Sequence, residues 1–198
     1  MSTRLVDVIV AGHRGDTALA TRALGDPEPD VRAAAISALE RIGALTGEHV
    51  TAAFGDSAPV VRRRAAEAAG GLPGVSLAPL LDDADATVVE VAAWACGEQE
   101  RVADDVLARL ITLASDHTEP LVREAAAAAL GAIGDERGLA AIIAACADKP
   151  NVRRRAVLAL APFDGPGVDA ALAAAANDRD WQVRQAAEDL ARASRPIE

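Results

Sequence analysis

Residue types that could carry catalysis or hold a metal ion are sparse in this chain. None of the histidines, His13, His49 and His117, begins a His-Glu pair or an HExxH motif, which a di-iron or zinc site would need. Neighbouring aspartates occur at positions 82–85 and 104–105, close to expected helix ends, and a carboxylate near the N-terminal end of a helix interacts favourably with the helix dipole. The sequence therefore predicts no catalytic residue, no metal site and no cofactor.

The two cysteines form no redox or zinc motif. Cys96 and Cys146 do not belong to a CxxC pair, so free thiols in a reducing compartment are expected. His13 and Asp16 interrupt the apolar run at the N-terminus too early for a signal peptide or a membrane span. These features predict a cytoplasmic protein, and the Ala- and Arg-rich composition, with Lys149 as its one lysine, indicates a bacterial source.

The composition favours helices that pack closely. Of the 198 residues 51% are hydrophobic but only 2% are aromatic, because alanine supplies most of the apolar fraction. Alanine has the highest helix propensity and a small volume, so a thin helical architecture is expected. The formal net charge of -10 disfavours binding along a nucleic-acid phosphate backbone.

One sequence pattern recurs roughly every thirty residues. Each copy contains an acidic residue, an anchor valine and an alanine-rich apolar run, and most copies also contain a proline before the valine. Proline is tolerated in the first turn of a helix, where its missing N–H would be unpaired anyway, so each copy predicts a helix start. The anchor residues are Val31, Val61, Val88, Val122, Val152 and Val183.

A second apolar run precedes each of these helices, and Gly- or Pro-containing segments separate the resulting pairs. The predicted unit is therefore helix, tight turn with Asp, helix, loop. We expect one repeat domain over residues 1–198, with a capping helix at 3–12 and repeats at approximately 15–43, 47–72, 74–98, 101–133, 135–162 and 165–195.

The pattern D-x-x-P-x-V-R-x-x-A-A-x-A-L resembles the HEAT repeat, and specifically the short HEAT-like subtype of phycobilisome linker lyases. This resemblance implies an all-α fold, a right-handed α-α superhelix whose second helices line a concave groove. It also implies a ladder of Asp and Arg side chains along the turns. The third copy departs from the pattern, since it has Val89 at the Arg position and Ala86 at the Pro position.

The resemblance assigns most of the recurring arginines to this ladder, with ligand binding as the weaker alternative. The matching positions are Arg32, Arg62, Arg123, Arg153 and Arg184, with Asp26, Asp56, Asp83, Asp116, Asp148 and Asp178.

Helical periodicity predicts which face of the second helices is open. With the anchor valine as position 0, an advance of about 100° per residue places positions +4, +7, +8 and +11 in the core and positions +2, +6 and +9 opposite. Trp94 occupies position +6 of the third repeat. Because Trp is often an interface hot spot, we expect it to bind a partner; the alternative is that the irregular third repeat turns it inward.

The predicted function is that of a noncatalytic protein- or peptide-binding scaffold or adaptor. A partner segment would lie in the groove, with apolar anchors and Arg or Glu borders. The alternatives are an accessory subunit of a lyase-like or cofactor-handling enzyme and, more weakly, a HEAT-like nucleic-acid-binding protein. We expect a monomer or weak homodimer without membrane contact. The candidate partner-binding residues are Trp94, Leu158, Arg63, Glu67, Glu90 and Arg154.

Overall fold

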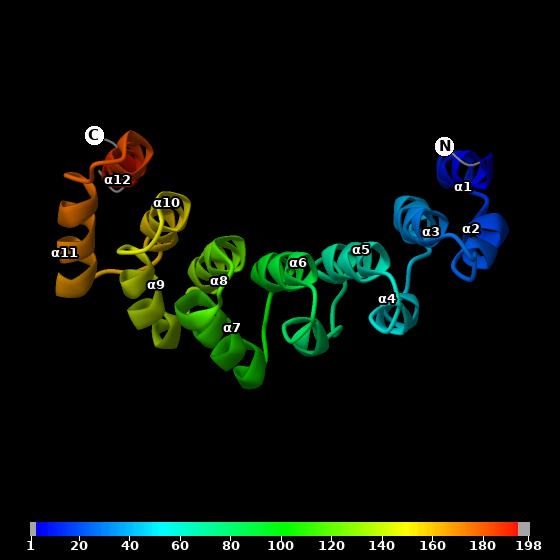
Figure 1. The fold of residues 1–198 in the computed structure, drawn as a ribbon, viewed down its shortest axis with the longest axis horizontal. Helices are drawn as coiled ribbons and strands as arrows, with labels where there is room; N and C mark the ends of the chain where they lie inside the picture. The colour runs from blue at the N-terminus through cyan, green and yellow to red at the C-terminus, as the bar shows by residue number, and fades with distance from the viewer. Residues whose placement is uncertain (1–2, 194–198) are drawn as a thin grey trace. The chain divides into compact units, whose positions relative to one another are not determined.

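The structure is a computed structural model that describes residues 3–193, and within this range the regular secondary structure is entirely helical (Figure 1). The last two residues of the repeat predicted at 165–195 lie outside the described range. The first helices of the pairs are α2 (Thr17–Ala23), α4 (Gly47–Ala53), α7 (Asp104–Asp116), α9 (Leu139–Ala145) and α11 (Pro166–Ala175). The second helices are α3 (Pro29–Ile42), α5 (Pro59–Ala69), α6 (Ala86–Gly97), α8 (Pro120–Ile133), α10 (Pro150–Ala159) and α12 (Trp181–Ala193).

The second helices begin at the residues that the sequence indicates. Pro29, Pro59, Pro120 and Pro150 are each the first residue of a helix, where no intrahelical N–H bond is lost. The preceding turns are held by side chains, as in the first repeat, where the Glu28 amide donates to Asp26 Oδ1 at 2.9 Å. The recurring Asp and Pro residues therefore define both the turn and the helix start.

The chain divides into two compact units, one up to Ala95 and the other from Cys96. In the first unit α3 packs between α1 (Thr3–Arg14) and α5, while α2 and α4 pack against α3 and α5 respectively (Figure 1). In the second unit α10 packs between α8 and α12, and α7, α9 and α11 form the other layer. Each unit is thus two layers of helices, consistent with a repeated helix pair.

Alanine fills the core of both units at a fixed place in the repeat. Position +4 is fully buried alanine in five second helices, and position +7 is buried alanine in the same helices. Small side chains here allow neighbouring helices to approach closely. The approach is closest at Gly131, where an added Cβ would lie 2.6 Å from Ala159 Cα. The buried +4 residues are Ala35, Ala65, Ala92, Ala126 and Ala156.

The third repeat differs from the predicted helix pair. The apolar run before α6 forms only a single 3-10 turn, η1 (Ala78–Leu80), rather than a first helix. Pro79 lies in the first turn of this run and cannot donate a backbone hydrogen bond, so a helix cannot begin much earlier in the run. Leu77 and Leu81 are nevertheless fully buried, so the run still supplies apolar packing. A second short turn, η2 (Glu136–Gly138), leads into α9.

The N-terminal helix is more than the cap predicted at residues 3–12. It extends over Thr3–Arg14 and packs on α3, the next second helix. Gly12 packs closely against Ala38 of the next second helix, as Gly131 packs against Ala159. An added Cβ at Gly12 would lie 3.0 Å from Ala38 Cα. By its packing on α3, α1 takes the place of a second helix.

Candidate functional site

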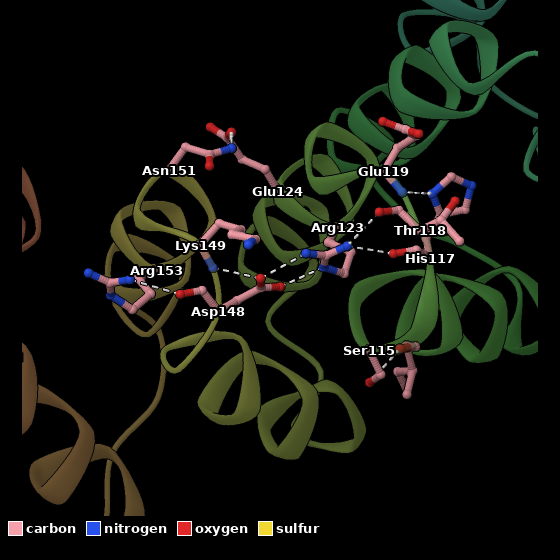
Figure 2. A network of polar contacts seen from close by, with 11 residues as sticks. Ser115, His117, Thr118, Glu119, Arg123, Glu124, Asp148, Lys149, Asn151 and Arg153 are labelled. Carbon is pink, nitrogen blue, oxygen red and sulfur yellow. Dashed lines mark hydrogen bonds and ion pairs between the residues drawn. The ribbon is translucent and has the colours of Figure 1, made fainter.

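The recurring arginines bind two successive turns of the array. Figure 2 shows the arrangement at Arg123, whose Nη1 donates to the carbonyl of His117 at 2.6 Å in the turn before its own helix. On its other side, Arg123 Nη2 donates to Asp148 Oδ1 at 2.8 Å, in the turn of the following repeat. One planar guanidinium therefore satisfies a turn carbonyl and a carboxylate at once. We call each Arg–Asp pair of this kind a rung.

The same geometry occurs four times, twice in each unit. Arg153, for example, donates to its own turn at Asp148 O, 2.8 Å, and to Asp178 Oδ1, 2.7 Å. The Arg side chains of the four rungs are 7–15% exposed. The ladder that the HEAT resemblance implies is thus present in both units, and these arginines serve the scaffold. The rungs are Arg32–Asp56, Arg62–Asp83, Arg123–Asp148 and Arg153–Asp178.

The rungs hold their carboxylates in the ionised form. Hydrogen bonds from the arginine are the largest cause of a lowered pKa at all four rung aspartates, and they outweigh the effect of desolvation, which raises the pKa. The same bonds raise the pKa of the four arginines. These groups are therefore permanently paired near neutral pH and are not available as acids or bases.

One predicted ladder position is wrong, because His117 and not Asp116 occupies it. The Glu119 amide donates to His117 Nδ1 at 3.1 Å, just as the Glu28 amide donates to an aspartate in the first repeat (Figure 2). Asp116 is instead the last residue of α7, which extends farther toward the turn than the alignment of the acidic residues suggested. The array therefore lacks a ladder arginine at Val89 and a ladder aspartate at His117.

Sequence reasoning missed a further ladder residue, Arg4 in α1. Its Nη1 lies 3.2 Å from Asp26 Oδ2, and its Nη2 pairs with Glu28. The signal that could have found it is a spacing of eight residues between the ladder position and a close-packed glycine. Arg4 and Gly12 share this spacing with Arg62 and Gly70.

Positions +2 and +6 of the second helices form the face that carries the candidate residues, and we call it the open face. None of the described residues at these positions is buried. The prediction that position +9 also lies on this face is wrong for Gly70 and Gly131. Both are buried, because the next second helix packs directly against them. Ile9 lies five residues after the ladder residue Arg4, which corresponds to position +6 of the other second helices, and it is 43% exposed. It therefore belongs to the open face of the first unit.

Trp94 and Glu90 lie on the open face of α6. The Trp94 side chain is 47% exposed, so the irregular third repeat does not turn it into the core. Glu90 is half-buried and precedes Trp94 by four residues, which places both side chains on one face of the helix. Within residues 3–193 no hydrogen bond or ion pair engages the Glu90 carboxylate.

Arg63 and Glu67, one turn apart on α5, are both exposed. Glu67 is engaged by Arg64, whose Nη1 lies 2.7 Å from Glu67 Oε2. Arg64 also donates from Nε to Ser37 Oγ at 2.7 Å and pairs with Glu40, so it is fixed across α3 and α5. Arg64 is therefore not free to contact a partner, whereas Arg63 has no such bonds in the described part of the chain.

Leu158 and Arg154 occupy the equivalent places on α10 in the second unit. Leu158 is 37% exposed, and Arg154, one turn earlier, is half-buried. The neighbouring Arg155 reaches back toward α8, where its Nε lies 3.7 Å from Glu124 Oε1. Asn151 Nδ2 donates to the same carboxylate at 2.7 Å. Arg155 is thus engaged by α8, and Arg154 is the guanidinium that remains beside Leu158.

The structure brings together no cluster of chemically reactive groups in the part of the chain that it describes. No three His, Cys, Asp or Glu side chains there are arranged to hold a metal ion. Burial raises the pKa of the Cys96 thiol to about 12 and that of Cys146 to about 11, so neither is a thiolate nucleophile near neutral pH. Over the same residues, no helix is both long and apolar enough to cross a membrane.

Known proteins show the same architecture. Residues 74–151 match a family model described as HEAT repeats, and residues 18–45 match one described as HEAT repeat. No curated protein matches the sequence.

Among solved structures, a designed armadillo repeat protein in complex with the peptide (KR)4 is similar with a TM-score of 0.63 and 18% identity, covering 89% of this chain and 98% of that one. A second designed armadillo repeat protein has a TM-score of 0.60, 18% identity and the same coverage. An engineered protein has a TM-score of 0.59 and 18% identity, covering 89% of this chain and 95% of its own.

These similarities establish the fold, and the all-α repeat architecture predicted from the sequence is confirmed. The family matches concern HEAT repeats in general, so the short phycobilisome-lyase subtype stays a prediction. Together with the recurring rungs, they identify the family. The chain is a HEAT-repeat protein.

Proposed function

We propose that the protein is a noncatalytic scaffold or adaptor that binds a peptide or protein segment along the open face of its second helices. The observation that carries this proposal is the pair of large apolar side chains at position +6, Trp94 and Leu158, which are exposed at 47% and 37% in a chain with 2% aromatic residues. Exposed Trp side chains surrounded by charged groups are typical of interface hot spots.

The charged candidates give this face its selectivity. Arg63 and Glu67 lie on α5, Glu90 adjoins Trp94, and Arg154 adjoins Leu158. Rim charges contribute more to orientation and partner choice than to affinity. A structurally similar designed armadillo repeat protein was solved in complex with a peptide, which supports peptide binding by an array of this kind. We place the interaction in the cytoplasm, where the free thiols stay reduced.

A random peptide display selection on the purified full chain tests the proposal. We expect enriched peptides whose affinity falls at least tenfold in Trp94→Ala and in Leu158→Ala, measured by calorimetry. Because both side chains are exposed, the midpoint of thermal unfolding should change by less than about 2 °C.

The control is Leu121→Ala, which removes an apolar side chain that is 56% exposed but lies outside positions +2 and +6 of its helix. Peptides that bind the Trp94→Ala and Leu158→Ala variants as well as the wild type would contradict the proposal. The alternative, an accessory subunit of a cofactor-handling enzyme, predicts a chromophore or metal in the purified protein, which absorbance and elemental analysis would detect.

A further inference from the structure

The carboxylates near the open face differ in whether the chain itself neutralises them. Glu40 and Glu67 are both engaged by Arg64, and Glu124 is engaged by Asn151 and Arg155. In α5 and α10 this neutralising arginine stands at position +3. In α6 the residue at that position is Val91, and Glu90 has no hydrogen-bond or ion-pair partner within residues 3–193.

The unpaired carboxylate lies beside an exposed indole. Side chains four residues apart on a helix are neighbours, with Cβ atoms about 5–6 Å apart. Glu90 and Trp94 have this spacing on α6, Glu90 is half-buried and Trp94 is 47% exposed. The ring face of Trp attracts a cation, and a partly desolvated carboxylate attracts it more strongly than one in bulk water. The pair therefore combines two favourable contacts for one positive group.

We infer that Glu90 and Trp94 form a recognition site for an arginine side chain of the bound segment. A guanidinium is planar, so it stacks on the indole while two of its N–H groups donate to the carboxylate. A lysine ammonium is a compact, strongly hydrated charge that cannot make both contacts as well. This inference rests on the proposed function, because it names the chemistry of the segment that the open face binds.

The equivalent position in the second unit has the opposite preference. There Arg154 takes the place of Glu90 and Leu158 takes the place of Trp94. A cation brought beside Leu158 meets like charge and no aromatic ring, so this site repels arginine. The arginine of the bound segment is therefore assigned to α6 alone, and the specificity comes from one helix rather than from the net charge of the chain.

The two tryptophans provide an internal comparison for a direct test. Trp181 is 65% exposed but has Gln185, not a carboxylate, four residues later and Asn177 four residues earlier. In the full-length ¹⁵N-labelled protein, the two indole N–H signals are assigned with Trp181→Phe. The probe is the blocked tripeptide Ala-Arg-Ala, and its controls are the same peptide with citrulline, which has the shape of arginine without its charge, and with lysine.

We expect the arginine peptide to shift the Trp94 signal saturably and to leave the Trp181 signal nearly unchanged. The citrulline peptide should bind at least tenfold more weakly, and the lysine peptide at least threefold more weakly. Glu90→Gln should weaken arginine binding about fivefold to tenfold, whereas the control Glu40→Gln, whose parent carboxylate is already engaged by Arg64, should change it less than twofold.

Equal shifts at both indoles, equal binding of citrulline or lysine, or equal losses in Glu90→Gln and Glu40→Gln would each overturn the inference. The outcome is independent of the peptide selection described above. If selected peptides require Trp94 but the arginine probe fails, only the arginine assignment falls. If the probe binds at Trp94 but no peptide is selected, the site stands and the groove-binding function falls.

Discussion

The turns that are joined by a rung have both an arginine and an aspartate at the ladder positions, whereas the third and fourth repeats lack one of these residues each. In each unit two arginines join successive turns, as Arg32 joins Asp56 and Arg153 joins Asp178. In the third repeat the arginine is replaced by Val89, and in the fourth the aspartate is replaced by His117. The substitutions occur together, so neither a buried arginine nor a turn carboxylate is left without its partner.

The boundary between the two compact units falls in this same region. It lies between Ala95 and Cys96, inside α6, the helix that carries Val89. Each unit therefore contains a complete ladder of its own. Within the second unit, Gly97 at the end of α6 packs closely on α8, where an added Cβ would lie 3.0 Å from Ala129 Cα. Rungs and close helix packing involve different residues, so substitutions can measure the two contributions separately.

The largest effect is expected from removing a buried rung. Arg153→Ala deletes the bonds to Asp148 O and Asp178, and it leaves the Asp178 carboxylate half-buried without its cation. The expected loss in free energy of unfolding is about 2–3 kcal/mol, measured by urea denaturation. Arg154→Ala, the neighbouring open-face arginine, should cost less than about 0.5 kcal/mol. Equal losses in the two variants would show that the rung contributes nothing to stability.

Overfilling a helix contact should cost somewhat less. Gly131→Ala places a Cβ 2.6 Å from Ala159 Cα, so α8 and α10 must move apart, at a cost of about 1–3 kcal/mol. Gly97→Ala meets Ala129 at 3.0 Å and should cost less, because a smaller displacement relieves it. The matched control is Gly71→Ala, which has no heavy atom within 4 Å of the added Cβ. The order Gly131, Gly97, Gly71 in thermal unfolding midpoints checks this expectation.

The rungs also predict how stability responds to acid. The pKa of Asp178 is lowered in the folded protein, chiefly by its hydrogen bonds with Arg153. The folded state therefore binds this proton less readily than the unfolded state, and the stabilisation is present above the ordinary pKa of about 3.8. It is lost as the pH falls below 4 through the lowered value. Unfolding free energies measured from pH 5 to pH 2 should decline less steeply in Arg153→Ala than in the wild type; an unchanged slope would exclude this linkage.

The smallest effect is expected at the turn that lacks a rung. His117→Ala removes the acceptor of the Glu119 amide, at a cost of about 0.5–1.5 kcal/mol. His117→Asp restores an acceptor of the kind that the first repeat uses, and its stability should lie within about 0.5 kcal/mol of the wild type. Urea denaturation of both variants at neutral pH measures the difference. If His117→Asp were as unstable as His117→Ala, the two turns would not be equivalent.

Most of the helix pairs could be predicted because their signals are local. Proline, aspartate and the anchor valine lie within six residues of one another, and each acts on its own turn. The first helix of the third repeat could not be predicted correctly, because a short apolar run such as that around Leu77 and Leu81 fits a helix or a packed turn equally well. The role of α1 was missed because its sequence has neither the proline nor the anchor valine that mark most of the other second helices.

The candidate site was predictable only as far as one helix determines it. The exposure of Trp94 and Leu158 follows from the 100° periodicity of their own helices. Whether a charged side chain is free depends on the neighbouring helix, which periodicity does not describe. The sequence therefore does not distinguish Arg64 and Arg155, which are engaged by α3 and α8, from the open-face arginines Arg63 and Arg154. The unpaired state of Glu90 likewise became visible only in three dimensions.

The forward reach of the ladder arginines determines how such a chain can gain or lose length. Arg123 and Arg153 make the same bonds, each to its own turn and to the aspartate of the next. Excising residues 124–153 would join Arg123 directly to Arg154, and Arg123 would then stand where Arg153 pairs with Asp178. A duplication or deletion in phase with these arginines keeps every remaining guanidinium matched to a carboxylate. The ladder arginines are thus suitable positions at which a whole repeat can be inserted or deleted, in gene evolution or in protein engineering.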